Sequence, residues 1–200
     1  MPNGLRHIGM IAQQWRTPAN AVTLLRVVLT PVIVLAILKG HHRAAAVCFA
    51  IAAWTDFFDG LLARSQRTPN LVGQYFDPIA DKLLLSGVFI ALAVQGSVPM
   101  WFLELVLGRD LAIVIASAIA MRVSTYSDYT PTVWGKISTV LQLFAAVTVM
   151  AANAEGSGTW VSVAWFFIGA AAVGTVWSTI HYTWRGVSYF IRLRAQPSAR

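Results

Sequence analysis

The chain has 200 residues, of which 57% are hydrophobic and only 12% are charged, and its mean hydropathy is +0.64. Soluble globular proteins carry about 25% charged residues, so this composition excludes an ordinary soluble domain and indicates an integral membrane protein. The net charge of +7 does not require nucleic acid, and we expect no nucleic-acid partner, because basic residues beside apolar segments more often set topology or meet anionic lipid headgroups.

The chain opens with a short amphipathic segment, residues 3–16. Its apolar residues recur at steps of three and four: Leu5, Ile8, Ile11, Ala12 and Trp15. This pattern is typical of a helix that lies in the membrane interface. A frayed terminal arm is the alternative, because the segment contains two glycines. We expect residues 1–17 to form an interfacial arm.

Six apolar stretches follow, and each approaches the roughly 20 residues that a helix needs to cross a bilayer. They are Ala19–Leu38, Ala44–Ala63, Pro78–Val94, Val98–Met121, Thr132–Ala152 and Trp160–Tyr182. The connections are short and leave no room for a soluble domain. The basic tail, residues 186–200, looks disordered from Arg192 onward. The sequence therefore predicts an all-α fold in which residues 1–200 form one membrane domain of six transmembrane helices with a short N-terminal interfacial helix.

The basic residues predict the orientation of these helices. One side carries Arg6, Arg16, Arg64, Arg67, Arg122, Arg185, Arg192, Arg194 and Arg200, whereas the other side carries only Lys39 and Arg43. Loops rich in lysine and arginine stay in the cytoplasm. We therefore expect both termini to be cytoplasmic, and we expect the protein in the inner membrane of a bacterium.

Four of the eight acidic residues lie in one stretch, at Asp56, Asp59, Asp77 and Asp81. Asp56 falls about 18 Å from the outer end of its segment at a rise of 1.5 Å per residue. Four further charges inside apolar segments fall in the same cytoplasmic half: Arg26, Arg109, Asp110 and Lys136. Such charges are costly within a membrane and mark functional sites, so this layer predicts a polar cavity that opens to the cytoplasm.

The spacing of the four carboxylates predicts a metal site. Asp56 and Asp59 are three residues apart and Asp77 and Asp81 four apart, so each pair shares a face of a helix. Four ionised carboxylates in one cavity would repel each other unless hard divalent cations lay between them. Mg²⁺ and Mn²⁺ prefer carboxylate oxygens, and a pair of ions can stabilise both oxygens of a phosphoryl displacement. We expect two such ions.

The residues after Asp56 suit a nucleotide. Gly60 and Ala63 lie on the Asp56 face, and their small size lets a base or ribose approach the helix. Arg64 follows at the cytoplasmic mouth, where a guanidinium can bind phosphate oxygens through two donors. The alternatives are ordinary: Asp-x-x-Asp can be a solvated face, small residues can serve helix packing, and Asp77 can cap a helix that starts at Pro78.

The whole stretch resembles the signature of the CDP-alcohol phosphotransferases, D-x2-D-G-x2-A-R-x8-G-x3-D-x3-D, and Gly73 occupies its remaining fixed position. The resemblance continues from residues 18–26 to residues 135–139. It implies a six-helix membrane fold, commonly a homodimer, in which a CDP-linked lipid gives its phosphatidyl group to an alcohol and CMP leaves.

Carried over residue by residue, the resemblance implies that Asp56, Asp59 and Asp77 ligate the metals. Asp81 would complete this cluster and act as the general base on the acceptor hydroxyl. The cytidine nucleotide would be held by Asp56, Gly60, Ala63 and Arg64, and Gly73 would have a structural role. The expected partners are CDP-diacylglycerol, a glycerol-based acceptor and membrane lipids.

Three cations in the charged layer suit an anionic acceptor: Arg26, Arg109 and Lys136. They could bind the phosphate of glycerol 3-phosphate or of phosphatidylglycerol. In the alternative, Arg109 and Asp110 are structural partners of the metal cluster or of each other. The segments around Asp81, Arg109 and Lys136 are most similar to the cardiolipin synthases of the family, which favours phosphatidylglycerol slightly. The phosphatidylglycerophosphate synthases are the alternative branch; they more usually have Arg-Glu at the Arg109-Asp110 position, although Gly135-Lys136 is similar to theirs.

Two hypotheses from other classes compete with the enzyme. A small ion-coupled transporter also uses carboxylates inside the membrane, but it predicts inverted repeats and interrupted helices in matched positions, and the sequence has neither. A membrane scaffold would pair its acids with bases, yet the four aspartates outnumber the cations on their own two helices. The enzyme is therefore the favoured interpretation.

Overall fold

The computed structural model describes residues 18–65, 71–123 and 133–195, and within them the side chains of residues 24–55, 82–115 and 133–184. These residues form six helices and no strand, which confirms the all-helical prediction. The helices fall into two compact units, one with α2 to α4 and one with α5, most of α6, and α7. The N-terminal arm predicted for residues 1–17 lies outside the described residues.

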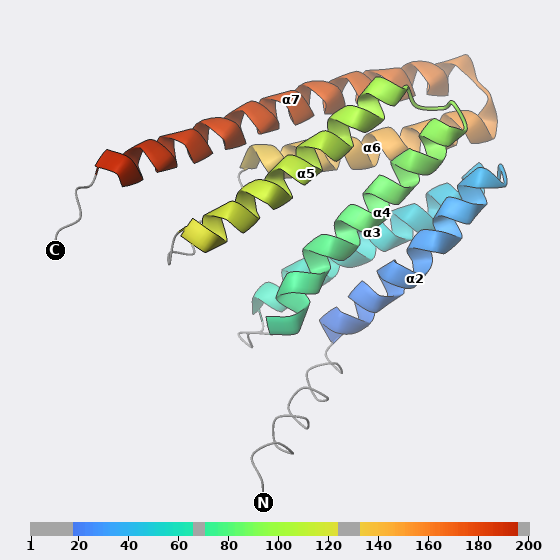
Figure 1. Ribbon diagram of the computed structural model, residues 1–200. Helices are drawn as coiled ribbons and strands as arrows, with labels where there is room; N and C mark the ends of the chain where they lie inside the picture. Colours follow the sequence, from blue (N-terminus) through green and yellow to red (C-terminus); the bar gives the residue numbers. More distant parts are fainter. Residues whose placement is uncertain (1–17, 66–70, 124–132, 196–200) are drawn as a thin grey trace, which may run out of the picture. The chain divides into compact units, whose positions relative to one another are not determined.

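The first unit is built around α2. It contains α2 (Pro18–Leu38), α3 (His42–Ser65) and α4 (Leu71–Val94), and α2 packs against both other helices (Figure 1). Its core is apolar and consists of Ile33, Ile37, Ala45, Phe49, Ala52, Leu84, Leu85, Val88, Phe89, Ala91 and Leu92. The helices come closest at Gly87, where an added Cβ would lie 3.3 Å from Cγ2 of Val34. The missing side chain therefore lets α4 approach α2.

A glycine closes the turn between α2 and α3. Gly40 has a φ of 78°, its N–H donates to the carbonyl of Ile37 at 2.8 Å, and the N–H of His41 donates to the carbonyl of Ala36 at 2.8 Å. These two bonds satisfy the last carbonyls of the helix. Gln95 Nε2 also donates to the Ile37 carbonyl at 2.6 Å, so the ends of α2 and α4 are joined. The connection between α2 and α3 is therefore a short turn, as the sequence predicts for the connections between its apolar stretches.

The second unit contains α5 (Met100–Val123), α6 (Val133–Glu155) and α7 (Gly158–Ala195). Helix α5 packs along α7. Helices α6 and α7 meet at Gly174, where an added Cβ would lie 3.1 Å from Cδ1 of Leu141. The apolar core of the unit includes Phe102, Leu103, Val106, Ala145, Ala146, Val149, Met150, Ala164, Ile168 and Ala171.

The predicted start of α4 is wrong. The helix begins at Leu71 and not at Pro78, so Asp77 lies inside it and is not its cap. Proline removes one helical hydrogen bond and favours the first turn of a helix, which is why the sequence pattern placed a start there. An internal proline is nevertheless tolerated in apolar helices when the freed carbonyl finds another partner.

The predicted disorder of the basic tail is also wrong in part. Helix α7 has 38 residues and runs to Ala195, which corresponds to about 57 Å at 1.5 Å per residue. Arg192 and Arg194 therefore belong to the helix that begins at Gly158. Hydropathy detects the apolar part of such a helix and not its polar continuation. Residues 196–200 lie outside the described residues.

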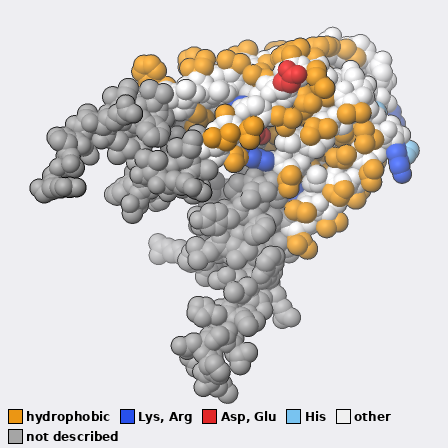
Figure 2. Space-filling model, viewed as in Figure 1, with side chains coloured by type: hydrophobic (Ala, Val, Ile, Leu, Met, Phe, Trp, Pro, Cys, Tyr) orange, Lys and Arg blue, Asp and Glu red, His pale blue; other side chains and the backbone are white. Residues whose placement is uncertain are grey.

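Within the described ranges, two helices are long and apolar enough by themselves to cross a membrane: α6 over Val133–Glu155 and α7 over Gly158–Trp184. Two further apolar segments, Leu24–Leu38 and Lys82–Val94, are shorter. Large apolar side chains are exposed on all six helices, for example Val28, Trp54, Leu83, Leu111, Val140 and Phe166. Figure 2 shows such side chains across the described surface in view, with few charged groups among them. So many exposed large apolar side chains indicate a partner surface or a membrane.

Candidate functional site

The four predicted carboxylates lie on two helices of one unit. Asp56 and Asp59 belong to α3, and Asp77 and Asp81 belong to α4. Both helices are continuous through these positions, so each pair occupies one helix face, as its spacing requires. The side chains at the motif positions lie outside the described set, including those at Gly60, Ala63, Arg64 and Gly73. Their roles therefore stay predictions.

The donor set fits a hard divalent cation. Four carboxylates on two helices supply only oxygen ligands, which Mg²⁺ and Mn²⁺ prefer. Among the side chains that the structure describes, no group of three or more histidines, cysteines or acids could hold a metal ion. The described part of the chain thus offers no competing metal site.

The three cations predicted to bind the acceptor have different environments. Arg26 lies on α2 in the first unit and is buried, whereas Arg109 on α5 and Lys136 on α6 belong to the second unit. Lys136 is exposed. Arg109 lies beside Gly135, the residue that precedes Lys136. The structure therefore brings Arg109 and the start of α6 together.

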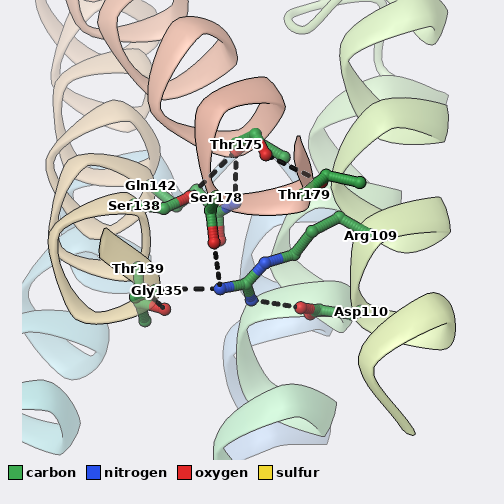
Figure 3. Close-up of polar contacts among 9 residues, drawn as sticks. All are labelled: Arg109, Asp110, Gly135, Ser138, Thr139, Gln142, Thr175, Ser178 and Thr179. Atoms are coloured by element: carbon green, nitrogen blue, oxygen red, sulfur yellow. Dashed lines mark hydrogen bonds and ion pairs between the residues drawn. The ribbon is translucent and has the colours of Figure 1, made fainter. Parts of the chain in front are cut away.

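Arg109 is buried and held by groups from three helices (Figure 3). Its Nη1 donates to Oδ1 of Asp110 at 2.6 Å, and the two side chains are only 8% and 12% exposed. Its Nη2 donates to the Gly135 carbonyl at 3.3 Å and to Oγ of Ser178 at 3.4 Å. Arg109 and Asp110 are therefore partners of each other, as one form of the structural alternative expects.

A cluster of uncharged polar side chains lies between α6 and α7 in the same unit. Gln142 Nε2 donates to Oγ1 of Thr175 at 2.9 Å, and the Ser138 and Thr175 hydroxyl oxygens are 3.1 Å apart. These residues and Ser178 are almost fully buried. Buried polar groups need such partners, because an unpaired one is costly.

This cluster was not predicted from the sequence. Its members carry no charge and lie within long apolar stretches, so neither hydropathy nor charge reveals them. The usable signal is spacing: Ser138 and Gln142 are four residues apart, and Thr175 and Ser178 are three apart. Each pair therefore shares a helix face, and polar residues on matched faces join helices in membranes.

Gly135 has a steric reason to be glycine. An added Cβ would lie 3.0 Å from Oη of Tyr182 and 3.3 Å from Nη2 of Arg109. Gly135 is buried, and the side chains of Tyr182 and Arg109 lie directly against the backbone of α6 at this position. A larger residue would displace one of them.

Comparison with known proteins identifies the family. Residues 16–177 match the family model for CDP-alcohol phosphatidyltransferase. The chain belongs to this family. The matched region includes the complete aspartate motif, Arg109 and Gly135, whereas Ser178 and Tyr182 lie just beyond it.

Several CDP-alcohol phosphatidyltransferases are similar to the chain. A Mycobacterium tuberculosis protein named probable phosphatidylglycerophosphate synthase is 40% identical over 134 residues, which cover 64% of this chain and 62% of the relative. The chain thus matches less than two thirds of that relative's length. A Pseudomonas fluorescens CDP-diacylglycerol-glycerol-3-phosphate 3-phosphatidyltransferase is 31% identical over 173 residues, 82% of this chain and 86% of the relative. A Drosophila melanogaster probable cardiolipin synthase (CMP-forming) is 33% identical over 145 residues, 64% of this chain and 44% of the relative.

Proposed function

We propose that the chain is a metal-dependent transferase that moves the phosphatidyl group of CDP-diacylglycerol to a glycerol-based acceptor and releases CMP. One observation carries this proposal: the family match spans residues 16–177 and includes every fixed position of the aspartate motif. The continuity of α3 and α4 through that motif supports it, because the carboxylate pairs then share helix faces.

In the proposed reaction, an acceptor hydroxyl oxygen attacks the phosphorus of the phosphatidyl group. The bond from that phosphorus to the oxygen bridging to CMP breaks, and CMP leaves with this oxygen. Asp81 takes the hydroxyl proton as general base, for which it must lie within hydrogen-bond reach of the attacking oxygen. Asp56, Gly60, Ala63 and Arg64 hold the cytidine nucleotide.

Asp56, Asp59, Asp77 and Asp81 hold two Mg²⁺ or Mn²⁺ ions in this proposal, and Gly73 completes the motif as a structural residue. When bound, such ions would stabilise the negative charge of the pyrophosphate oxygens. The carboxylates fix where that charge lies, because each pair projects from one face of a continuous helix.

For the acceptor, we propose glycerol 3-phosphate. The segments around Asp81, Arg109 and Lys136 slightly favoured phosphatidylglycerol. The mycobacterial and pseudomonad relatives, however, are named for phosphatidylglycerophosphate synthesis, and the second of them matches 86% of its own length. Cardiolipin synthase is the second candidate, supported by the name of the Drosophila relative. Arg26, Arg109 and Lys136 would bind the acceptor phosphate.

We also propose that all six helices cross the membrane, with both termini in the cytoplasm of a bacterium, and that the protein is a homodimer. The tryptophans of α7 support the membrane placement: Trp160 and Trp184 are exposed and lie about 36 Å apart along the helix at 1.5 Å per residue. The hydrocarbon core is about 30 Å thick, and tryptophans favour both of its borders.

The deciding experiment is CMP release by purified protein in detergent with CDP-diacylglycerol. Glycerol 3-phosphate, phosphatidylglycerol and myo-inositol phosphate are compared as acceptors, each with Mg²⁺, with Mn²⁺ and with a chelator. We expect metal-dependent release with glycerol 3-phosphate. Release with phosphatidylglycerol alone would identify a cardiolipin synthase instead. If well-folded protein released no CMP with any of these acceptors, the proposed acceptor class would fail. Other alcohols would then be compared, and ion-coupled uptake into vesicles would test the transporter.

A variant at Asp81 tests the proposed base. Asp81→Asn should lower turnover at least about 100-fold, the usual contribution of a general base, while binding of a CDP nucleotide changes little. Glu155→Gln is the matched control, because Glu155 is an exposed acid at the end of α6, outside the motif. Equal loss of turnover and nucleotide binding in Asp81→Asn would show that Asp81 is needed for the metal site or the fold and is not a base.

A further inference from the structure

The Arg109 guanidinium is held at its two terminal nitrogens, whereas its Nε has no partner in the described part of the chain. Nη1 donates to Asp110, and Nη2 is shared between the Gly135 carbonyl and Ser178 Oγ (Figure 3). Nε is buried and has no hydrogen-bond partner among the described residues. Arginine presents its donors in a rigid planar fork, so the contacts at Nη1 and Nη2 also determine the direction of the Nε–H bond.

A buried cationic donor without a partner is costly and calls for an anionic oxygen. Asp110 pairs with Arg109 and offsets part of its charge. The contribution of Arg109 to phosphate binding should therefore depend on the direction of its remaining donor more than on its charge. Hydrogen bonds to charged groups lose strength steeply when they are misaligned. Groups that orient the guanidinium should consequently control the affinity for the phosphate.

We propose that Ser178 is a positioning residue for the acceptor phosphate, and that it acts by holding Arg109 so that Nε–H points at a phosphate oxygen. This inference rests on the proposed function. Ser178 binds no substrate itself in this arrangement. It fixes Nη2 from α7, while the Gly135 carbonyl fixes the same nitrogen from α6.

The surroundings of Ser178 suit this role. Ser178 is fully buried, and Thr175, one turn earlier on α7, is joined to Ser138 and Gln142 of α6. The position of Ser178 along α6 is therefore fixed. Gly135 leaves room for the guanidinium, because an added Cβ would lie 3.3 Å from Nη2.

The test is a double-mutant cycle in the full-length protein. Ser178→Ala should raise KM for glycerol 3-phosphate about 2- to 10-fold, the value of one modest hydrogen bond, with kcat and KM for CDP-diacylglycerol nearly unchanged. Arg109→Lys is the second variant, because lysine keeps the charge beside Asp110 but lacks the fork. In that background Ser178→Ala should change KM less than about twofold.

Two further variants separate positioning from general damage. Thr179→Val is the matched control, and KM should not change. It removes the neighbouring hydroxyl of α7, which among the described residues donates to the Thr175 carbonyl of its own helix. Gly135→Ala removes no hydrogen-bonding group but crowds Nη2, so it should raise the same KM as Ser178→Ala. Size-exclusion chromatography verifies that each variant is folded.

The outcomes distinguish this inference from the proposed function. The positioning role is refuted, and the enzyme assignment stands, if the wild-type protein is active but Ser178→Ala leaves KM for glycerol 3-phosphate unchanged, as Thr179→Val should. The same holds if Ser178→Ala raises this KM by the same factor with Arg109 and with Lys at that position. If phosphatidylglycerol supports turnover, the same cycle uses that acceptor. If wild-type protein shows no turnover, the proposed function fails, and the dissociation constant of glycerol 3-phosphate decides: equal constants for wild type and Ser178→Ala overturn the positioning role.

Discussion

Replacing Thr175 by valine should destabilise the second unit by about 1–3 kcal/mol. Valine keeps the shape of threonine but removes the hydroxyl that serves both Gln142 and Ser138, at 2.9 and 3.1 Å. Both partners are buried, at 1% and 0% exposure, so water does not replace the lost bonds. Polar contacts between membrane helices contribute about 0.6 kcal/mol on average and up to about 1.7, and an unsatisfied buried partner costs about 1–3 kcal/mol.

The assay is reversible unfolding in mixed detergent micelles, followed by tryptophan fluorescence. Trp134 on α6 and Trp177 on α7 form an edge-to-face pair with ring centroids 5.9 Å apart, so separation of these two helices should change the tryptophan emission. Thr179→Val is the control and should change the unfolding free energy by less than about 0.5 kcal/mol. Adding Gln142→Leu to Thr175→Val should recover stability, because it removes the unsatisfied amide. A further loss in the double variant, or a Thr175→Val effect no larger than the control, would refute this reasoning.

Two other predictions concern the first unit. Gly87→Leu should destabilise this unit by about 1–3 kcal/mol in the same assay, because an added Cβ would lie 3.3 Å from Val34 and 3.5 Å from Thr30. Gly169→Leu is the control, because a Cβ at Gly169 meets open space. Equal losses of stability in the two variants would contradict the packing argument. Burial lowers the pKa of His42, at the start of α3, below its usual 6.5, so the unfolded chain takes up the proton first and stability should be full above pH 6.5 and fall as the pH drops through the lowered pKa. A Tm series from pH 8 to 5 should show this decline, and a decline of the same size in His42→Gln would assign it to other groups.

The existence of the helices was predictable, whereas two of their ends were not. Apolar stretches of about 20 residues can satisfy their backbone in a membrane only as helices, so all six were found. The start of α4 was misplaced because Pro78 looks like a helix start when considered alone. The end of α7 was misplaced because the polar stretch around Arg192 lacks the hydropathy by which the rest of the helix was recognised.

The charged residues of the candidate site were predictable, whereas their neighbours were not. Arg109 stood out because a cation in an apolar stretch is rare, and its pairing with Asp110 was one of two open alternatives. The choice between them depends on side-chain geometry, since adjacent residues on a helix do not face each other. Ser178 and Thr175 carry no charge that marks them. Their spacing of three residues becomes informative only together with the residues opposite them on α5 and α6.

Helix α7 joins two regions that the amino-acid sequence treats separately. Ser178 and Ala195 belong to one uninterrupted helix, with about 26 Å between them at 1.5 Å per residue. A helix resists bending and twisting over such a distance, so this part of α7 moves as one rigid segment. Rotation or sliding of the basic end around Arg192 would move Ser178 by a similar amount. A spectroscopic probe attached near Ala195 would therefore report a change in the position of α7 relative to Arg109.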